Sequence, residues 1–286
     1  MSIQIPVAFV NQFNTNVVML AEQKTSRLRG TVNIEQVTGE SFPVERLGGV
    51  TVNSVTDRHG DTPLNSTPHT RRWGYIVDYD VADLIDKQDR VKLLIDPDGM
   101  YTMRHAGAMG RAIDDEIIRA LGASVNEGHT GSTTTVYDTG QSIASSSTGL
   151  TVQKLLEAKE MMDADEVDEF YPRFFACAAR QLRELLGDDK ITSSDFTTVK
   201  ALVRGEVDEY LGFKFVRTER LTKVSNDRYC FAWAMPAIRL GIAQAPTSEV
   251  DTRPDKRNAK QIYTYGSWGA VRVEDTMVVR VLADES

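Results

Sequence analysis

Residues 48–80 contain two extended segments joined by a polar link, and this feature constrains the fold most. The second segment alternates apolar and polar residues with a period of two, which is typical of a β-strand. One of its faces is formed by Trp73, Tyr75, Val77 and Tyr79. The first segment, residues 48–56, is rich in valine, and the link, residues 57–70, is too long for a tight hairpin turn. Because an isolated two-stranded hairpin is marginally stable in water, we expect a long β-arm whose apolar face is covered from outside.

The sequence next predicts one long helix over residues 97–122. Asp96 is a suitable N-cap, Pro97 suits the first helical position, and Gly122 stands where a C-terminal glycine belongs. At 1.5 Å per residue the helix would be on the order of 37 Å long. One apolar stripe is expected along it, formed by Met103, Ala106, Gly110, Ile113, Ile117 and Leu121.

The same helix contains three consecutive acids, residues 114–116, near His105 and several arginines. An active site would need these groups to converge on one reacting atom. On a helical wheel Asp115 lies in a row with Arg111 and Arg119 at steps of four, where they would pair along the surface. The other two acids fall on either side of this row, so we interpret the motif as the charged face of a structural rod. Gly107 and Gly110 predict that another chain segment packs close to the helix.

The rest of the chain mixes helices and strands. A helix capped by Thr151 is predicted over residues 151–167, and Pro236 is expected to break a buried strand over residues 228–243. Further elements are a buried strand over 171–179, helices over 181–188 and 193–205, a helical turn leading through Gly212 into a strand, and alternating strands over 261–283. Helices segregated from mainly antiparallel strands indicate the α+β class.

Composition limits the function. The net charge of −8 argues against a protein that mainly grips nucleic acid backbone. Cys177 and Cys230 lie in apolar runs, which favours buried, reduced thiols. No apolar run approaches the roughly 18 residues of a membrane span, and the first residues lack a charged region before an apolar stretch, as a secretory signal would have. These features predict a cytoplasmic protein without a membrane segment.

No motif for phosphate, dinucleotide, acyl-transfer or zinc chemistry occurs in the sequence. The four histidines lack a second ligand at metal spacing, and the acidic residues 163–169 lack the glycine and spacing of a calcium loop. We therefore expect a solvated acidic turn there, and no catalytic residue, cofactor or metal. Arg58, Arg71 and Arg72 flank the polar link near Asp57 and Asp61, where they would either pair with a neighbouring chain or keep an exposed loop soluble.

Two stretches carry a resemblance to a known family: RELLGDDKITSSDFTTVKALVRGEVDEYLGFKFVRTERL (183–221) and AMGRAIDDEIIRAL (108–121). Together with the order of arm, long hairpin, long helix and mixed domain, they resemble the major capsid protein of tailed bacteriophages, the Hong Kong 97-type fold. The resemblance implies an N-terminal arm (1–45), an extended loop (46–80), a peripheral domain (81–169) with a spine helix (97–122), and an axial domain (170–250). The final segment (251–286) would return to the peripheral domain, with the last strand in the peripheral sheet.

The resemblance also implies function and partners. Pentamers and hexamers of the chain would assemble into an icosahedral shell around double-stranded DNA, without sequence-specific DNA contacts, in the host cytoplasm and then in the virion. Inter-subunit contacts are expected from Arg58, Asp61, Arg71, Arg72, Trp73 and Tyr75. Because residues 46–80 contain no lysine, covalent cross-linking through the loop is not expected. A separate scaffolding protein, a portal and a cement protein are expected partners. Two alternatives are an encapsulin-like nanocompartment shell and a soluble enzyme built on the three acids.

Overall fold

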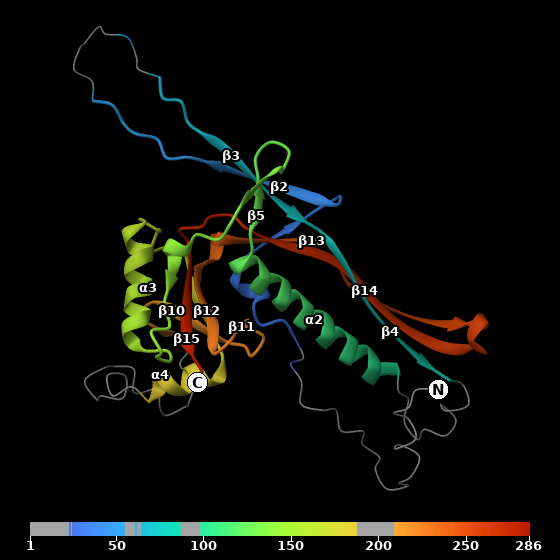
Figure 1. Ribbon diagram of the computed structural model, residues 1–286. Coiled ribbons are helices and arrows are strands. Elements are labelled where there is room, and N and C mark those ends of the chain that lie inside the picture. The colour runs from blue at the N-terminus through green and yellow to red at the C-terminus, as the bar shows by residue number, and fades with distance from the viewer. Residues whose placement is uncertain (1–22, 24, 55–60, 62–63, 87–97, 188–208) are drawn as a thin grey trace.

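The computed structural model of the chain describes residues 23, 25–54, 61, 64–86, 98–187 and 209–286. The described part contains three β-sheets and a long helix that lies along the first of them, and a hairpin projects far from the body (Figure 1). Most strand pairings are antiparallel, with β1–β13, β8–β10 and β7–β15 as the parallel ones in the described part. The predicted α+β class is confirmed.

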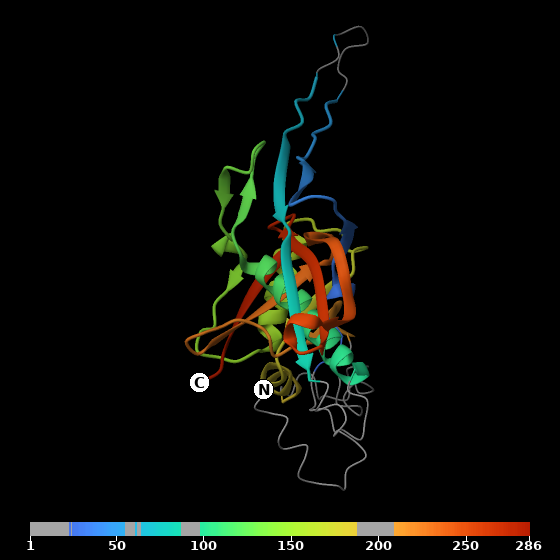
Figure 2. The same cartoon turned by 90° about the vertical axis from the view of Figure 1, so that its right-hand side faces the viewer.

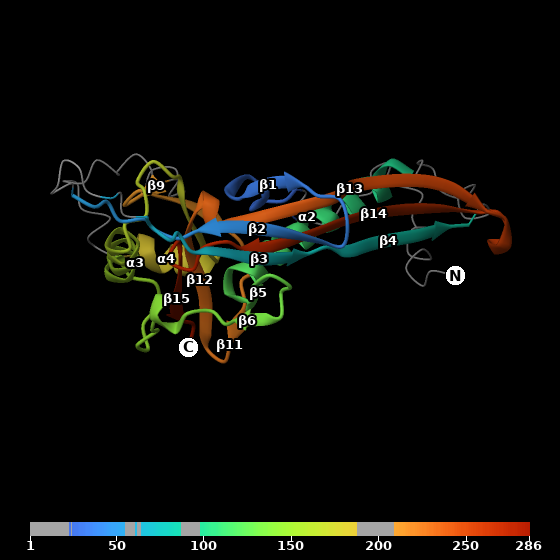
Figure 3. The same cartoon turned by 90° about the horizontal axis from the view of Figure 1, so that it is seen from above.

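The first sheet has four strands in the order β1 (Asn33–Gln36), β13 (Ile238–Arg253), β14 (Ala259–Arg272) and β4 (Val77–Ile85). Strands β13 and β14 form a long hairpin, closed by the short helix η5 (Pro254–Lys256), that runs away from the rest of the body (Figure 3). The long helix α2 (Asp98–Gly122) packs against β14 and β13.

Helix α2 confirms the predicted helix to within one residue at its start. The proposed cap Asp96 and Pro97 lie outside the described residues. The predicted apolar stripe is right for the second half, where Ile113, Ile117 and Leu121 are buried. In the first half the stripe is wrong, since Met103 is 56% exposed and His105 is buried instead. The reason is a polar contact: His105 Nε2 lies 2.9 Å from Asp83 Oδ2 on β4, which turns the histidine toward the sheet.

The second sheet has the strand order β7 (Ser142–Ile143), β15 (Val278–Asp284), β12 (Asp227–Ala234), β8 (Arg173–Cys177), β10 (Phe213–Arg217) and β9 (Glu209–Tyr210), with β11 (Lys223–Val224) beside β12. Helices α3 (Val152–Ala164) and α4 (Ala179–Leu186) lie next to the strands of this sheet (Figure 1). The cap of α3 is confirmed, because Thr151 Oγ1 accepts a hydrogen bond from the Lys154 amide. Cys177 and Cys230 are buried, as predicted.

A buried lysine and a buried carboxylate fasten this second sheet to its surroundings. Lys154 is 6% exposed, and its Nζ donates to the carbonyls of Ser145, Thr148, Gly149 and Leu282 at 2.8–2.9 Å. Glu285, which follows β15, accepts hydrogen bonds from Arg228, Lys223 and Gln181. Burial raises the pKa of Glu285, but these donors outweigh it and lower the pKa to about 2.

Two local predictions differ from the structure here. The helical turn expected before Gly212 is wrong for residues 209–210, which form β9 of a tight hairpin with β10. Leu211 and Gly212 both have positive φ (54° and 84°), the geometry of a two-residue hairpin turn. The helix expected over 193–205 lies outside the described residues.

The final strand was predicted to rejoin the sheet beside the long helix, and this is wrong. Strand β15 pairs with β12 and β7 in the second sheet. The strands in the sheet beside the long helix are β13 and β14, which precede β15 in the chain. The predicted break at Pro236 is confirmed as the short helix η4 (Met235–Ala237), where the chain passes from one sheet to the other. Alternation of apolar residues is the same in both sheets, so the sequence pattern could not distinguish them.

The third sheet carries the projecting hairpin and has the order β2 (Ser41–Leu47), β3 (His69–Tyr75), β5 (Val125–Glu127) and β6 (Thr133–Thr135). The predicted first strand is wrong: residues 48–54 form no strand, and β3 pairs with β2 instead. Residues 33–36 and 41–47, most of which fall within the predicted arm, form strands β1 and β2 of the body. Figure 2 shows the hairpin as a long extension beyond β2 and β3. The short helices η2 (Arg29–Thr31) and η3 (Thr139–Gln141) complete the described elements.

Candidate assembly site at the base of the hairpin

The base of the hairpin is fixed by an aromatic ring set between two glycines. Phe42 on β2 is 4% exposed. A Cβ atom on Gly74 of β3 would lie 2.3 Å from its ring, and one on Gly241 of β13 would lie 2.6 Å from it. Only glycine admits such a close approach. The ring therefore joins the third sheet to the first.

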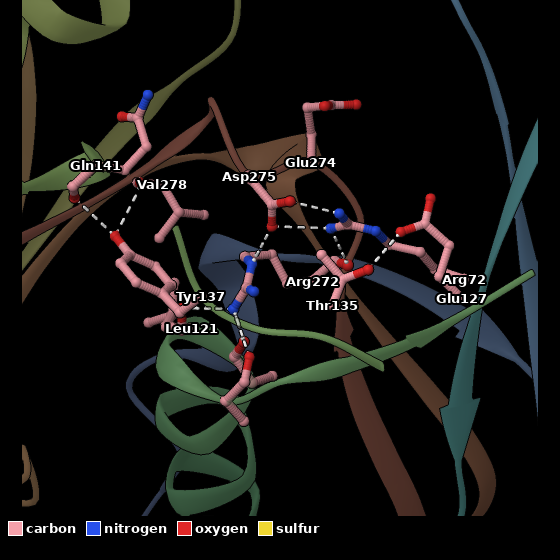
Figure 4. Close-up of polar contacts among 12 residues, drawn as sticks. Arg72, Leu121, Glu127, Thr135, Tyr137, Gln141, Arg272, Glu274, Asp275 and Val278 are labelled. Carbon is pink, nitrogen blue, oxygen red and sulfur yellow. Dashed lines mark hydrogen bonds and ion pairs between the residues drawn. The ribbon is translucent and has the colours of Figure 1, made fainter. Parts of the chain in front are cut away.

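An ion cluster lies beside this contact and connects the hairpin to helix α2 (Figure 4). Arg72 on β3 is 1% exposed and donates from Nη1 and Nη2 to the two carboxylate oxygens of Asp275 at 3.0 and 2.5 Å. Arg272 on β14 donates from Nε to the same carboxylate at 2.6 Å. Burial raises the pKa of Asp275, but the hydrogen bonds from both arginines outweigh it, so the pKa lies below its usual value.

Arg272 also closes the C-terminal end of α2. Its Nη1 donates to the carbonyls of Ala120, Leu121 and Ala123 at 3.3, 3.1 and 2.8 Å. These are the carbonyls that a helix leaves without internal partners, and a cation near them is also favoured by the helix dipole. Hairpin, helix and the β14–β15 turn are thus held by one connected group of charges.

Tyr137 covers the other side of Arg272. The guanidinium carbon of Arg272 lies 5.0 Å from the centre of the tyrosine ring, and that of Arg280 lies 4.7 Å from it. The Tyr137 hydroxyl donates to the Gln141 carbonyl at 2.8 Å (Figure 4). Burial raises the pKa of Tyr137 to about 12, so the ring stays neutral between the two cations.

A single residue, Ile76, separates β3 from β4, so the chain passes directly from the third sheet into the first. The Ile76 amide donates to the Glu40 carbonyl at 2.9 Å. Beneath this junction runs Gly269 of β14, where a Cβ atom would lie 1.8 Å from the Tyr75 carbonyl oxygen. The two backbones can approach this closely because position 269 has no side chain.

Four of the six residues predicted to contact other subunits lie on β3: Arg71, Arg72, Trp73 and Tyr75. Arg71 pairs with Glu45 and lies over the ring of Trp73 at 5.6 Å. Trp73 Nε1 donates to the Gly128 carbonyl at 2.9 Å, and Tyr75 is 47% exposed. Arg72 is engaged within its own subunit. Asp61 is exposed, and Arg58 lies outside the described residues.

Apolar side chains are exposed on the hairpin beyond its base. Leu47, Val50, Val52 and Leu64 are 70%, 59%, 97% and 94% exposed, respectively. Several large apolar side chains exposed along one projection are typical of a surface that is covered by a partner.

The three acids of α2 point to three different partners, which confirms that they do not converge. Asp114 is fully buried and accepts hydrogen bonds from Gln23 Nε2, Ser26 Oγ and the amides of Arg27 and Leu28 at 2.5–3.1 Å. A Cβ atom on Gly110 would lie 2.8 Å from the Ser26 amide nitrogen. The predicted close packing against the helix is therefore confirmed at Gly110, and the packed segment is residues 25–28.

The predicted row of Arg111, Asp115 and Arg119 is wrong. Asp115 forms an ion pair with Arg220, which precedes β11, and Arg119 pairs with Glu116 one turn earlier. Glu116 is 4% exposed and also accepts a hydrogen bond from the Ala270 amide at 3.2 Å. Asp115 thus takes a partner from a distant part of the chain, whereas Arg119 takes a local partner at a spacing of three residues instead of four. Local pairs at either spacing contribute similarly small amounts, so helical spacing alone does not decide which pair forms.

Other candidate chemistry is absent from the described residues. Residues 163–169 form an exposed acidic turn, apart from buried Val167, as predicted. Among the side chains that the structure places, no three histidine, cysteine or acidic groups are arranged to hold a metal ion. Within the same ranges, none of the helices combines the length and apolar character needed to cross a bilayer.

Sequence reasoning missed Phe42, Arg272 and Asp275, which hold the hairpin base. Arg272 gave one usable signal, because it is a charged residue within the alternating segment GAVRV. Phe42 and Asp275 gave none, since their partners come from distant strands.

A firmly anchored hairpin with an exposed apolar extension, and charges used for clamping segments together, define a structural subunit built to associate with other chains. The sequence of residues 5–285 matches the family model described as phage capsid protein. The chain belongs to this family. It is a coat protein of the virion, and its role is structural, not enzymatic.

Solved structures confirm the fold of tailed-phage capsid proteins. The capsid of cyanophage P-SCSP1u is 14% identical with a TM-score of 0.75, and covers 97% of this chain and 94% of its own. The capsid of Ralstonia phage GP4 is 10% identical with a TM-score of 0.74, and the match covers 97% of this chain and 96% of that one. The structure from Mycobacterium phage Che8 is 18% identical with a TM-score of 0.70, and the match covers 95% of this chain and 97% of that one. A comparison with curated protein sequences found no match.

Proposed function

We propose that this chain is the major capsid protein of a tailed bacteriophage, and that its pentamers and hexamers form an icosahedral shell around double-stranded DNA. The observation that supports this most is the hairpin, whose base is buried in the subunit and whose apolar extension is exposed. Such an extension gains stability when it lies on a neighbouring subunit. Many modest contacts of this kind add up to a stable shell.

In this proposal the first sheet and α2 form the peripheral domain, the second sheet forms the axial domain, and residues 46–80 form the extended loop. Arg71, Trp73 and Tyr75 contact a neighbouring subunit, together with Arg58 and Asp61. Arg72 acts within the subunit by anchoring the loop.

The proposed partners are further copies of the chain, a separate scaffolding protein during assembly, a portal and a cement protein. The acidic subunit, with a net charge of −8, supports enclosure of DNA without tight binding along its length. Because residues 46–80 contain no lysine, the contacts of the loop are noncovalent. A ladder of linked subunits on denaturing gels of mature particles would contradict this point.

The test is assembly of hairpin variants, imaged by electron microscopy after co-expression with the phage scaffolding protein. Val52→Asp and Leu64→Asp place charges on residues that are nearly fully exposed in the subunit. We expect the subunit to keep its thermal stability while closed particles are lost. Val136→Asp is the matched control, because Val136 is 68% exposed and lies outside the hairpin. Normal particles from both hairpin variants would refute the proposal.

A further inference from the structure

A cavity of about 200 Å³ opens at the base of the hairpin. It is bounded by the end of α2, by β3, by β5 and by β14. Its lining includes Trp73, Tyr75, Arg119, Ala123, Asn126 and Arg272. Aromatic walls with a few convergent polar groups are typical of a site that receives a specific group.

The charge of this cavity is one-sided. Arg119 and Arg272 are the charged residues in its lining; the side chain of Arg119 faces outward, whereas that of Arg272 is fully buried behind the wall. The side chain of Arg119 is 54% exposed although it pairs with Glu116, so part of its guanidinium remains open to a second acceptor. A second carboxylate near it would be attracted, because an arginine has five N–H donors.

Arg272 adds a partly compensated charge behind the cavity wall, since it pairs with Asp275 and donates to carbonyls at the end of α2. It is fully buried and shares the single carboxylate of Asp275 with the buried Arg72. Among the residues that the structure describes, its Nη2 has no hydrogen-bond partner. An incompletely neutralised buried guanidinium is costly, and a nearby negative charge offsets that cost.

We propose that this cavity receives an aspartate or glutamate side chain from a second copy of the chain, paired with Arg119 and held between Trp73 and Tyr75. The inference rests on the proposed function, because it needs a neighbouring subunit in the shell. A second copy fits as the source of the acid, since each copy has 41 acidic and 33 basic residues. The cavity also lies beside the strand from which inter-subunit contacts are proposed.

A structure of the assembled wild-type shell by electron cryo-microscopy tests the inference directly. We expect a carboxylate of a neighbouring subunit within ion-pair distance of Arg119, between the rings of Trp73 and Tyr75. A shell in which the cavity holds only water, a small anion or a group of its own subunit would overturn the inference. In that case the proposed function would stand, because the shell itself would have formed.

A filling variant gives an independent test. Ala123→Met fills the cavity without changing its charge, and should therefore weaken the association between subunits. A loss of about 1.4 kcal/mol per subunit contact would lower the association constant of that contact about tenfold. The control is Ala106→Met, an exposed position on α2 outside the cavity. Assembled fractions are measured by light scattering, and folding by the melting temperature of the unassembled subunit. A folded Ala123→Met subunit that assembles like wild type would also overturn the inference.

Discussion

Replacing Asp114 by asparagine should release residues 25–28 from the long helix. The buried carboxylate accepts hydrogen bonds from four donors, two of them backbone amides. An asparagine oxygen can accept from about two donors, and its NH₂ group would face the other two. Each lost bond to a charged acceptor is worth about 1.5–3 kcal/mol. We therefore expect the free energy of unfolding to fall by about 3–5 kcal/mol.

The neighbouring acid provides the control. Asp115 pairs with Arg220 at the surface, where both side chains are more than a third exposed. Asp115→Asn should therefore cost less than about 1 kcal/mol. The two variants differ by one position on the same helix and by the same chemical change, so any general effect of the substitution cancels.

Two measurements separate the variants. Urea unfolding of the unassembled subunit gives the change in stability, and limited trypsin digestion gives the local effect, because Arg27 and Arg29 are exposed trypsin sites in the clamped segment. Asp114→Asn should be cut there much faster than wild type, and Asp115→Asn should not. Equal losses of stability in the two variants, or unchanged cleavage in Asp114→Asn, would refute the reasoning.

Three further perturbations should act on other parts of the fold. Lys154→Met removes the buried donor shared by four backbone carbonyls and should cost about 3–5 kcal/mol in thermal unfolding. Lys159→Met, at a less buried lysine of the same helix, should cost little. Gly269→Ala puts a Cβ atom against the β3–β4 backbone and should lower the melting temperature sharply, whereas Gly30→Ala meets no atom within 4 Å and should not. The folded-state pKa of Glu285 is depressed from 4.5 to about 2, so its stabilisation is fully present above pH 4.5 and is lost as the pH falls toward 2. Acid titration of stability should show this loss in wild type and a smaller one in Glu285→Gln.

The long helix and several of the elements after it followed from the sequence because their signals are local. Thr151 caps α3, and Pro236 breaks the strand where the structure breaks it. The hairpin partner did not follow, because residues 48–56 carry a clearer valine pattern than residues 41–47, which contain a proline and two charges. Strand β2 is selected by tertiary contacts, above all by Phe42 between its two glycines.

The candidate site was predictable only in part. The alternation around Trp73 and Tyr75 located β3, since period-two patterns mark a strand. Nothing in that pattern shows that Arg72 is buried, because its acceptor Asp275 lies about two hundred residues further along the chain. The same holds for Asp114, whose donors come from the N-terminal segment. Pairings over such separations are decided by the fold, and short-range periodicity carries no information about them.

The direct passage from β3 into β4 has a mechanical consequence. Residues 69–85 form two strands interrupted only at Ile76, a beam of roughly 55 Å at 3.3 Å per residue. Its middle rests on Gly269 of β14, and its two arms belong to different sheets. A sideways force on the projecting arm is therefore transmitted along the backbone to β4, an edge strand of the first sheet. The continuous backbone of β3 and β4 thus links the position of the projecting arm to that of the edge strand of the first sheet.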